Sequence, residues 1–92
     1  MDIWERKVTD GLSDTEKLVL KILLSYEKYV TRDDIQRDMP NPKIPIGTLS
    51  ATLCNMFHDG FCMRYHIPTK KGQIAFYCLA PRARQALSEI LK

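Results

Sequence analysis

The spacing of the apolar residues along this 92-residue chain changes from a helical to a strand period at Gly60, and no other feature restricts the fold as much. Before Gly60 the apolar residues recur every three or four positions, which is typical of amphipathic helices. The segments FCMRYHI (61–67) and QIAFYCL (73–79) instead alternate with a period of two and are rich in aromatic and β-branched residues, so both are predicted strands. From Pro81 a helical spacing returns. The sequence therefore predicts a mainly α protein with a small β-hairpin, in the order helix, helix, helix, hairpin, helix.

Local signals mark the starts of the first two helices. The segment SDTE (13–16) is a capping box, in which the serine hydroxyl accepts from the glutamate amide while the glutamate reaches back. Thr31 is the predicted N-cap of the second helix, with Val30 and Ile35 forming a hydrophobic staple. Pro40 is expected to end that helix after Met39. The first helix should turn one apolar stripe inward, formed by Leu18, Val19, Ile22, Leu23 and Tyr26.

A third helix is predicted over residues 45–58, after the proline-rich loop PNPKIP (40–45), because proline suits the first helical position. Gly60 fits the left-handed residue that follows a helix, with Phe61 folding back on the last turn. The residues expected to face inward are Leu49, Leu53, Met56 and Phe57. The residues expected to face outward are Gly47, Ala51, Cys54, Asn55 and His58, with Thr48 on the flank.

The remaining segments complete the predicted organisation. PTKKG (68–72) is expected to be the turn of the hairpin, and residues 12–92 to form one domain behind an N-terminal extension, 1–11. A short helix over residues 2–10 would carry Ile3, Trp4 and Val8. The apolar face of the last helix is assigned to Ala83, Ala86, Leu87, Ile90 and Leu91. Two capped helices, a third helix and a hairpin are the layout of a winged helix-turn-helix domain.

Three segments also resemble a known family. LSDTEKLVLKILLSYEKYVTRDDIQRDM, TLSATLCNMFHDGFCMRY and AFYCLAPRARQAL resemble, in order, the opening helix, the recognition helix with its following strand, and the second wing strand of MarR/PadR-type winged-helix regulators. The resemblance covers about residues 12–91 and implies a DNA-binding transcription regulator. Arg64 and the wing lysines match positions that contact DNA in such proteins. Two residues depart from the family pattern. Where this chain has Ala51 the family often has a long polar residue, and where it has Ala80 the family usually has threonine.

Charge is unevenly distributed and adds to this interpretation. Residues 1–40 hold seven Lys/Arg and nine Asp/Glu, a sum of −2, whereas residues 41–92 hold seven and two, a sum of +5. A basic half on a small domain can attract a polyanion. Because the third helix itself carries no lysine or arginine, the positive charge is expected on its flanks, at Lys43, Arg64, Lys70, Lys71, Arg82 and Arg84.

The predicted interface with duplex DNA combines the third helix, in the major groove, with the 68–72 turn against the backbone. Asn55 can pair with adenine, Thr48 can touch a thymine methyl or a phosphate, and Ser50 is better placed as a phosphate donor. The candidate DNA-binding residues are Lys43, Thr48, Ser50, Ala51, Asn55, Arg64, Lys70 and Lys71.

A second interpretation stays open. A helix face of Gly, Ala and Cys allows close approach of another protein segment, so the domain could be an interaction module of the antirepressor or inhibitor type, with little DNA binding. A homodimer through the terminal helices is also a candidate, since regulators of this type commonly bind two half-sites.

Other classes of function find less support in the sequence. Cys54, His58, Cys62 and His66 are four residues apart, but Gly60 interrupts the helix that would bring them together, so no metal site is predicted. Three cysteines without a CxxC pair argue against a disulfide framework; a pair between Cys62 and Cys78 across the hairpin is less favoured than reduced, packed thiols. No catalytic residue set, cofactor motif, membrane span or signal peptide is predicted, and the expected location is cytoplasmic.

Overall fold

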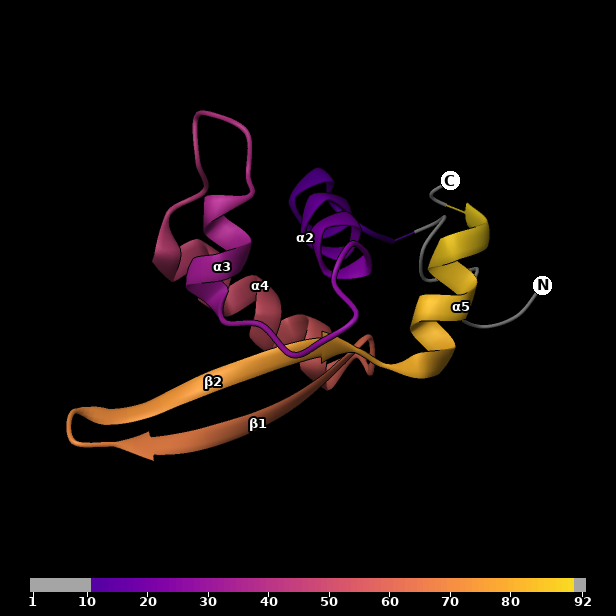
Figure 1. Ribbon diagram of the computed structural model, residues 1–92. Coiled ribbons are helices and arrows are strands. Elements are labelled where there is room, and N and C mark those ends of the chain that lie inside the picture. Colours follow the sequence, from indigo (N-terminus) through magenta and orange to yellow (C-terminus); the bar gives the residue numbers. More distant parts are fainter. Residues whose placement is uncertain (1–10, 91–92) are drawn as a thin grey trace.

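The computed structural model describes residues 11–90, and the predicted helix over residues 2–10 lies outside them. The described chain forms α2 (Asp14–Leu24), α3 (Arg32–Arg37), α4 (Ile46–His58), β1 (Cys62–Thr69), β2 (Gly72–Leu79) and α5 (Pro81–Ile90). The predicted order of three helices, a hairpin and a last helix is observed. Figure 1 shows α2, α3 and α4 gathered on one side of the hairpin, with α5 at the end where the two strands meet the helices. This arrangement is compatible with a winged helix.

Both predicted N-caps are confirmed. The Ser13 hydroxyl accepts from the Glu16 amide at 3.2 Å while Glu16 accepts from the Ser13 amide at 3.1 Å. Thr31 and Asp34 form a second capping box at the start of α3. The predicted end of α3 was wrong, because the helix stops at Arg37 with Asp38 as its C-cap instead of continuing to Met39. The residue before a proline is disfavoured in helical geometry, so the chain leaves the helix earlier than Pro40 alone requires.

The bounds of α4 also differ slightly from the prediction. Pro45 is the N-cap of α4, with an extended ψ of 146°, and the first helical residue is Ile46. The C-terminal end is as expected. Gly60 has a φ of 85°, in the left-handed region, and the Phe61 amide donates to the Met56 carbonyl at 2.9 Å. Phe61 is buried, so the chain folds back onto the core directly after α4.

The hairpin is longer than the sequence indicated. Thr69 pairs with Gly72, so the turn contains only Lys70 and Lys71, and Pro68 belongs to β1 rather than to a five-residue turn. Neither Lys70 nor Lys71 has a positive φ, and Gly72, directly after the turn, has a φ of 128°. The Thr69 side chain contributes further, accepting from the Lys71 amide and donating to the Gly72 carbonyl.

The connection between α2 and α3 pairs with the hairpin at a single residue. Val30 forms an isolated antiparallel bridge with Tyr77, through backbone hydrogen bonds of 2.9 and 2.7 Å. The bridge ties the start of α3 to the middle of β2, which fixes the direction of the hairpin relative to the helices. The sequence offered no signal for this bridge.

One hydrophobic core holds the elements together. It includes the predicted α4 residues Leu49, Leu53 and Met56, together with Leu20, which lies outside the predicted α2 stripe. Ala83 and Leu87 join the same core from α5. None of the helices described between residues 11 and 90 is long and apolar enough to cross a membrane.

Candidate nucleic-acid interface

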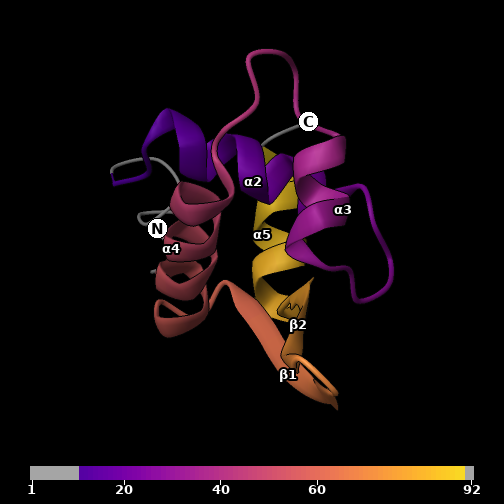
Figure 2. The ribbon, with the colours of Figure 1, turned by 90° about the vertical axis from the view of Figure 1, so that its left-hand side faces the viewer.

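No other element described between residues 11 and 90 covers the outward face of α4, and this face carries no formal charge. Its exposed residues are Gly47, Thr48, Ala51, Asn55 and His58, while Ser50 and Cys54 are half-buried. Figure 2 shows α4 at the side of the molecule, with no other element in front of it and the hairpin extending beside it. This face matches the predicted outward residues. Phe57, predicted to face inward, is only half-buried.

The hairpin and α4 lie next to each other. Ser50 of α4, Thr31 and Arg32 at the start of α3, and His66 and Gln73 of the hairpin line one open hollow of about 440 Å³. The hollow therefore lies between the hairpin and one flank of α4, at Ser50.

Arg32 is a cation near α4 that the sequence analysis did not single out. Its Nη1 donates to the Ser50 Oγ at 2.7 Å, across 18 positions of sequence, and the side chain is exposed. The contact holds a positive charge against the helix that has none. Asp33 lines the same hollow, so the charges of Arg32 and Asp33 there nearly offset each other.

The lysines of the hairpin turn are exposed cations of the predicted set at the tip of the hairpin. Lys70 and Lys71 are exposed. Figure 1 shows the hairpin projecting beyond the helices, with its turn at the far end. These two ammonium groups can approach a polyanion from the side of α4 without any rearrangement of the core.

Arg64 lies on β1 but contacts α4. Its guanidinium carbon is 4.1 Å from the centre of the Phe57 ring, a distance at which a cation is attracted to the face of an aromatic ring. The contact explains why Phe57 stays partly exposed at the surface. It also fixes the guanidinium of Arg64 beside the last turn of α4.

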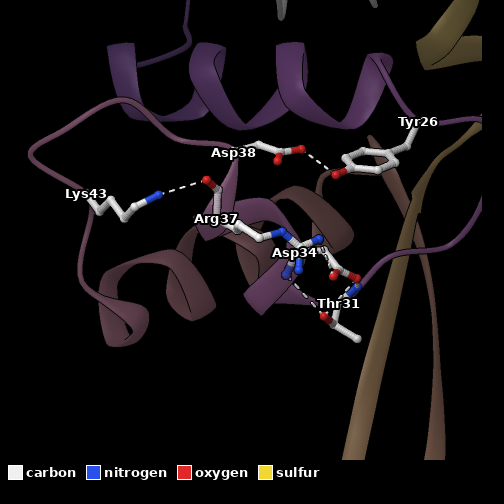
Figure 3. Close-up of polar contacts among 6 residues, drawn as sticks. All are labelled: Tyr26, Thr31, Asp34, Arg37, Asp38 and Lys43. Carbon is white, nitrogen blue, oxygen red and sulfur yellow. Dashed lines mark hydrogen bonds and ion pairs between the residues drawn. The ribbon is translucent and has the colours of Figure 1, made fainter.

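Two predicted cationic anchors have structural contacts instead. Figure 3 shows Lys43 reaching back to α3; its ammonium donates to the carbonyls of Gln36 at 2.9 Å and Arg37 at 2.8 Å. Lys43 therefore caps the C-terminus of α3, where a cation is stabilised by unpaired carbonyls. It stays exposed, but its charge is already held by the protein.

Arg84 has the same kind of role at the end of α2. Its guanidinium donates to the carbonyl of Leu24 at 3.0 Å and to the carbonyl of Tyr26. The side chain is half-buried between α2 and α5. Its prediction as a DNA anchor is therefore not supported by its placement, whereas Arg82 is exposed.

The acidic residues of α3 are also largely engaged. Figure 3 shows Asp34 between Thr31 and Arg37, and Asp38 accepting from the Tyr26 hydroxyl. The hydrogen bond from the Thr31 amide, followed by contacts with the Thr31 hydroxyl and Arg37, lowers the pKa of Asp34. The hydrogen bond to Asp38 raises the pKa of Tyr26. These contacts engage Asp34, Arg37 and Asp38 next to the candidate interface.

The cysteines show no arrangement for metal or disulfide chemistry. All three are free, and the register pairs Cys62 with Leu79 and Met63 with Cys78, so Cys62 and Cys78 are not opposite each other. Burial raises the pKa of the Cys62 thiol to about 12. Between residues 11 and 90, no group of three or more His, Cys, Asp or Glu side chains could hold a metal ion.

Comparisons with known proteins do not assign the chain to a family. No protein-family model matches it, and no curated protein is significantly similar to it in sequence.

Proposed function

We propose that this chain is a winged-helix DNA-binding domain that regulates transcription, with α4 in the major groove of duplex DNA and the hairpin turn against the backbone. The observation that carries the proposal is the exposed, charge-free face of α4 beside a projecting hairpin that ends in two lysines. The major groove admits a single α-helix, and phosphate contacts position a protein while base contacts give specificity.

The two parts of the interface would divide this work. Asn55 is exposed on α4 and can form two hydrogen bonds with an adenine edge, while Ala51 and Gly47 let the helix backbone approach the bases closely. Lys70 and Lys71 would contact phosphates. Arg32 and Ser50, already in contact, form a second candidate for phosphate binding on the side of α3.

The test is binding of the purified chain to a pool of random duplexes at several salt concentrations. Affinity should fall steeply as salt rises, because each phosphate contact releases counterions. Sequencing the duplexes that stay bound should then reveal a preferred half-site. Absence of binding even at low salt would contradict the proposal.

Two pairs of variants separate the parts of the interface. Lys70→Ala with Lys71→Ala should lower the salt slope by about 1.8 and weaken binding about 30-fold near 0.15 M salt, for two lost phosphate contacts. Lys17→Ala with Lys21→Ala removes the same charge from exposed positions of α2 and should change the slope far less. Equal effects of the two pairs would show that only overall charge matters.

Asn55→Ala tests base recognition in the same assay. The variant should keep most of its affinity for random duplex but lose preference at one or more positions of the selected half-site, because only the base contact is removed. A variant with an unchanged selected sequence would exclude Asn55 from recognition.

A protein-binding module is the second candidate function. It is favoured by the same α4 face, where Gly47, Ala51 and half-buried Cys54 allow close approach of another helix. In that case the random-duplex assay should give no salt-dependent binding, and substitution of Ala51 by a large residue should disrupt the partner complex without unfolding the domain.

A further inference from the structure

Two arginines from other elements contact α4, which has no lysine or arginine of its own. Arg32, at the start of α3, donates from its Nη1 to the Ser50 hydroxyl at 2.7 Å. Arg64, on β1, places its guanidinium carbon 4.1 Å from the centre of the Phe57 ring. The positive charge that α4 lacks in its own sequence is therefore supplied at its surface by the neighbouring elements.

Both contacts lie on the same flank of α4. Ser50 and Phe57 are seven residues apart, which corresponds to almost two full turns and to about 10 Å along the helix axis. Each is half-buried, between the buried stripe of α4 and its exposed face. Figure 2 shows α3 and the hairpin together to one side of α4. We call the side defined by Ser50 and Phe57 the hairpin flank of α4.

The opposite flank has no such contact among the residues that the structure describes. Thr52 lies two positions after Ser50 and therefore on the other side of the helix, about 160° away around the axis. Its hydroxyl donates to the Thr48 carbonyl within α4 and not to another element. The positive charge next to α4 is therefore one-sided.

Both guanidiniums keep N–H donors for a ligand. An arginine has five such donors, and the contact with Ser50 uses one of those of Arg32. The contact of Arg64 with the face of the Phe57 ring uses none, because it is an attraction between the cation and the ring. Between residues 11 and 90, neither arginine forms an ion pair with an acidic side chain. Guanidinium groups in this state are suited to bind phosphate oxygens through two parallel hydrogen bonds.

We propose that Ser50 and Phe57 are positioning residues for DNA binding. They hold two guanidiniums on the hairpin flank, those of Arg32 and Arg64, and both contact phosphates of the same DNA strand. This inference rests on the function proposed above. A helix about 10–12 Å across fills a major groove about 12 Å wide, so the flanks of the helix lie next to the phosphates that border the groove. Two guanidiniums on one flank are therefore next to one strand, while the outward face stays available for bases.

Arginines that are held before DNA arrives lose less freedom on binding. Immobilising a long side chain at an interface weakens affinity about three- to tenfold, and the contacts with α4 remove part of this loss during folding. The two anchors are not equal. The Asp33 carboxylate borders the same hollow as Arg32 and repels a phosphate there. Arg64 is therefore expected to be the stronger anchor.

Duplex binding by four variants of the full chain tests the contact between Phe57 and Arg64. Arg64→Gln should weaken binding about fivefold near 0.15 M salt and lower the salt slope by about 0.9, for one lost phosphate contact. Phe57→Leu should weaken binding about threefold with an unchanged slope, because the charge remains but is no longer held. Phe57→Tyr keeps the ring and should bind like the wild type. In the Arg64→Gln background, Phe57→Leu should change affinity less than about 1.5-fold, since no guanidinium is left to position.

The contact between Ser50 and Arg32 is tested in the same way. Ser50→Ala should weaken binding about twofold, and this effect should disappear in the Arg32→Gln background. Thr52→Val is the matched control, since it removes a hydroxyl from the opposite flank, and it should change affinity less than Ser50→Ala does. Equal effects of Ser50→Ala and Thr52→Val would overturn the assignment of the anchors to one flank.

A measurement without DNA shows whether Phe57 holds Arg64. Protons over the face of an aromatic ring are shifted upfield, so the NMR signals of the Arg64 side chain should be displaced in the free wild type. Phe57→Leu should remove this displacement and Phe57→Tyr should keep it. Arg64 signals at the positions of an ordinary exposed arginine would overturn the inference, and this result does not depend on any variant folding.

The outcomes separate this inference from the proposed function. A wild type that binds no duplex would contradict the proposed function and remove the basis of the inference with it. If the wild type binds duplex but Phe57→Leu binds equally well, only the positioning role is wrong. The same holds if Phe57→Leu weakens binding as much in the Arg64→Gln background as in the wild type.

Discussion

Arg84 is expected to hold α5 against the end of α2, and its replacement by methionine should lower the stability of the domain markedly. The guanidinium donates to the carbonyls of Leu24 and Tyr26, and a third contact with the Leu23 carbonyl is long, at 3.4 Å. A hydrogen bond from a charged donor contributes about 1.5–3 kcal/mol when buried. Because Arg84 is only half-buried, each of the two shorter bonds is taken at about 1–1.5 kcal/mol, which gives a loss of about 2–3 kcal/mol.

That loss is large for a chain of this size. A domain of 92 residues has a free energy of unfolding of about 5–14 kcal/mol. A loss of 2–3 kcal/mol corresponds to a fall in Tm of about 10–20 °C. Methionine keeps much of the apolar stem of arginine, so the effect reports the hydrogen bonds rather than lost packing.

Urea unfolding followed by circular dichroism measures this effect. Arg84→Met should shift the midpoint strongly, and Arg84→Lys should fall between it and the wild type, because lysine lacks the planar fork of donors with which the guanidinium holds the carbonyls. Arg82→Met, two residues away and exposed, is the control and should stay within about 0.5 kcal/mol of the wild type. If Arg84→Met were as stable as the wild type and instead weakened DNA binding, the assignment of Arg84 to the α2 terminus would be wrong.

Three further predictions concern single positions. Gly60→Ala should destabilise the domain by about 1–2 kcal/mol, because Gly60 has a φ of 85°. Gly47→Ala should instead stabilise it by up to about 1 kcal/mol, since a Cβ there meets no atom within 4 Å. Urea unfolding of the two variants should therefore give changes of opposite sign in the free energy of unfolding. Burial raises the pKa of the Cys62 thiol to about 12, so this thiol should react with a thiol reagent at pH 8 only when the domain unfolds. Fast labelling of Cys62 in the native state would contradict its burial. The pKa of Asp34 is lowered in the folded state, so its ionised carboxylate stabilises the fold above the ordinary carboxyl pKa, and this stabilisation is lost as pH falls through the lower folded value. The difference in stability between wild type and Asp34→Asn should therefore shrink in acid. A difference that grows in acid would refute the assigned direction of the pKa shift.

Much of the candidate site could be predicted from the sequence, because the relevant signals are local. The spacing of Leu49, Leu53 and Met56 was enough to identify which face of α4 is buried, and hence that Thr48, Ala51 and Asn55 are exposed. DNA binding by that face stays a prediction, since pattern and placement describe a surface and not its ligand.

The cations were predicted less well. Lys43 and Arg84 occur in the basic half of the sequence, but each donates to the carbonyls at the end of another helix. Arg32 lies in the acidic half, yet it touches Ser50 on α4. Charge along the sequence does not show which side chains are already engaged, because that depends on which helix ends come within reach after folding.

The sequence by itself determined the order of the elements, the helix caps at Ser13 and Thr31, and the chain reversal at Gly60, since each depends on residues a few positions apart. Only the tertiary structure decided the direction of the hairpin, through the bridge between Val30 and Tyr77, and the exposure of its outer face. Alternation along a strand predicts that two faces differ, but not which one the helices will cover. That choice is made by packing between segments far apart in the chain, where local preferences carry no information.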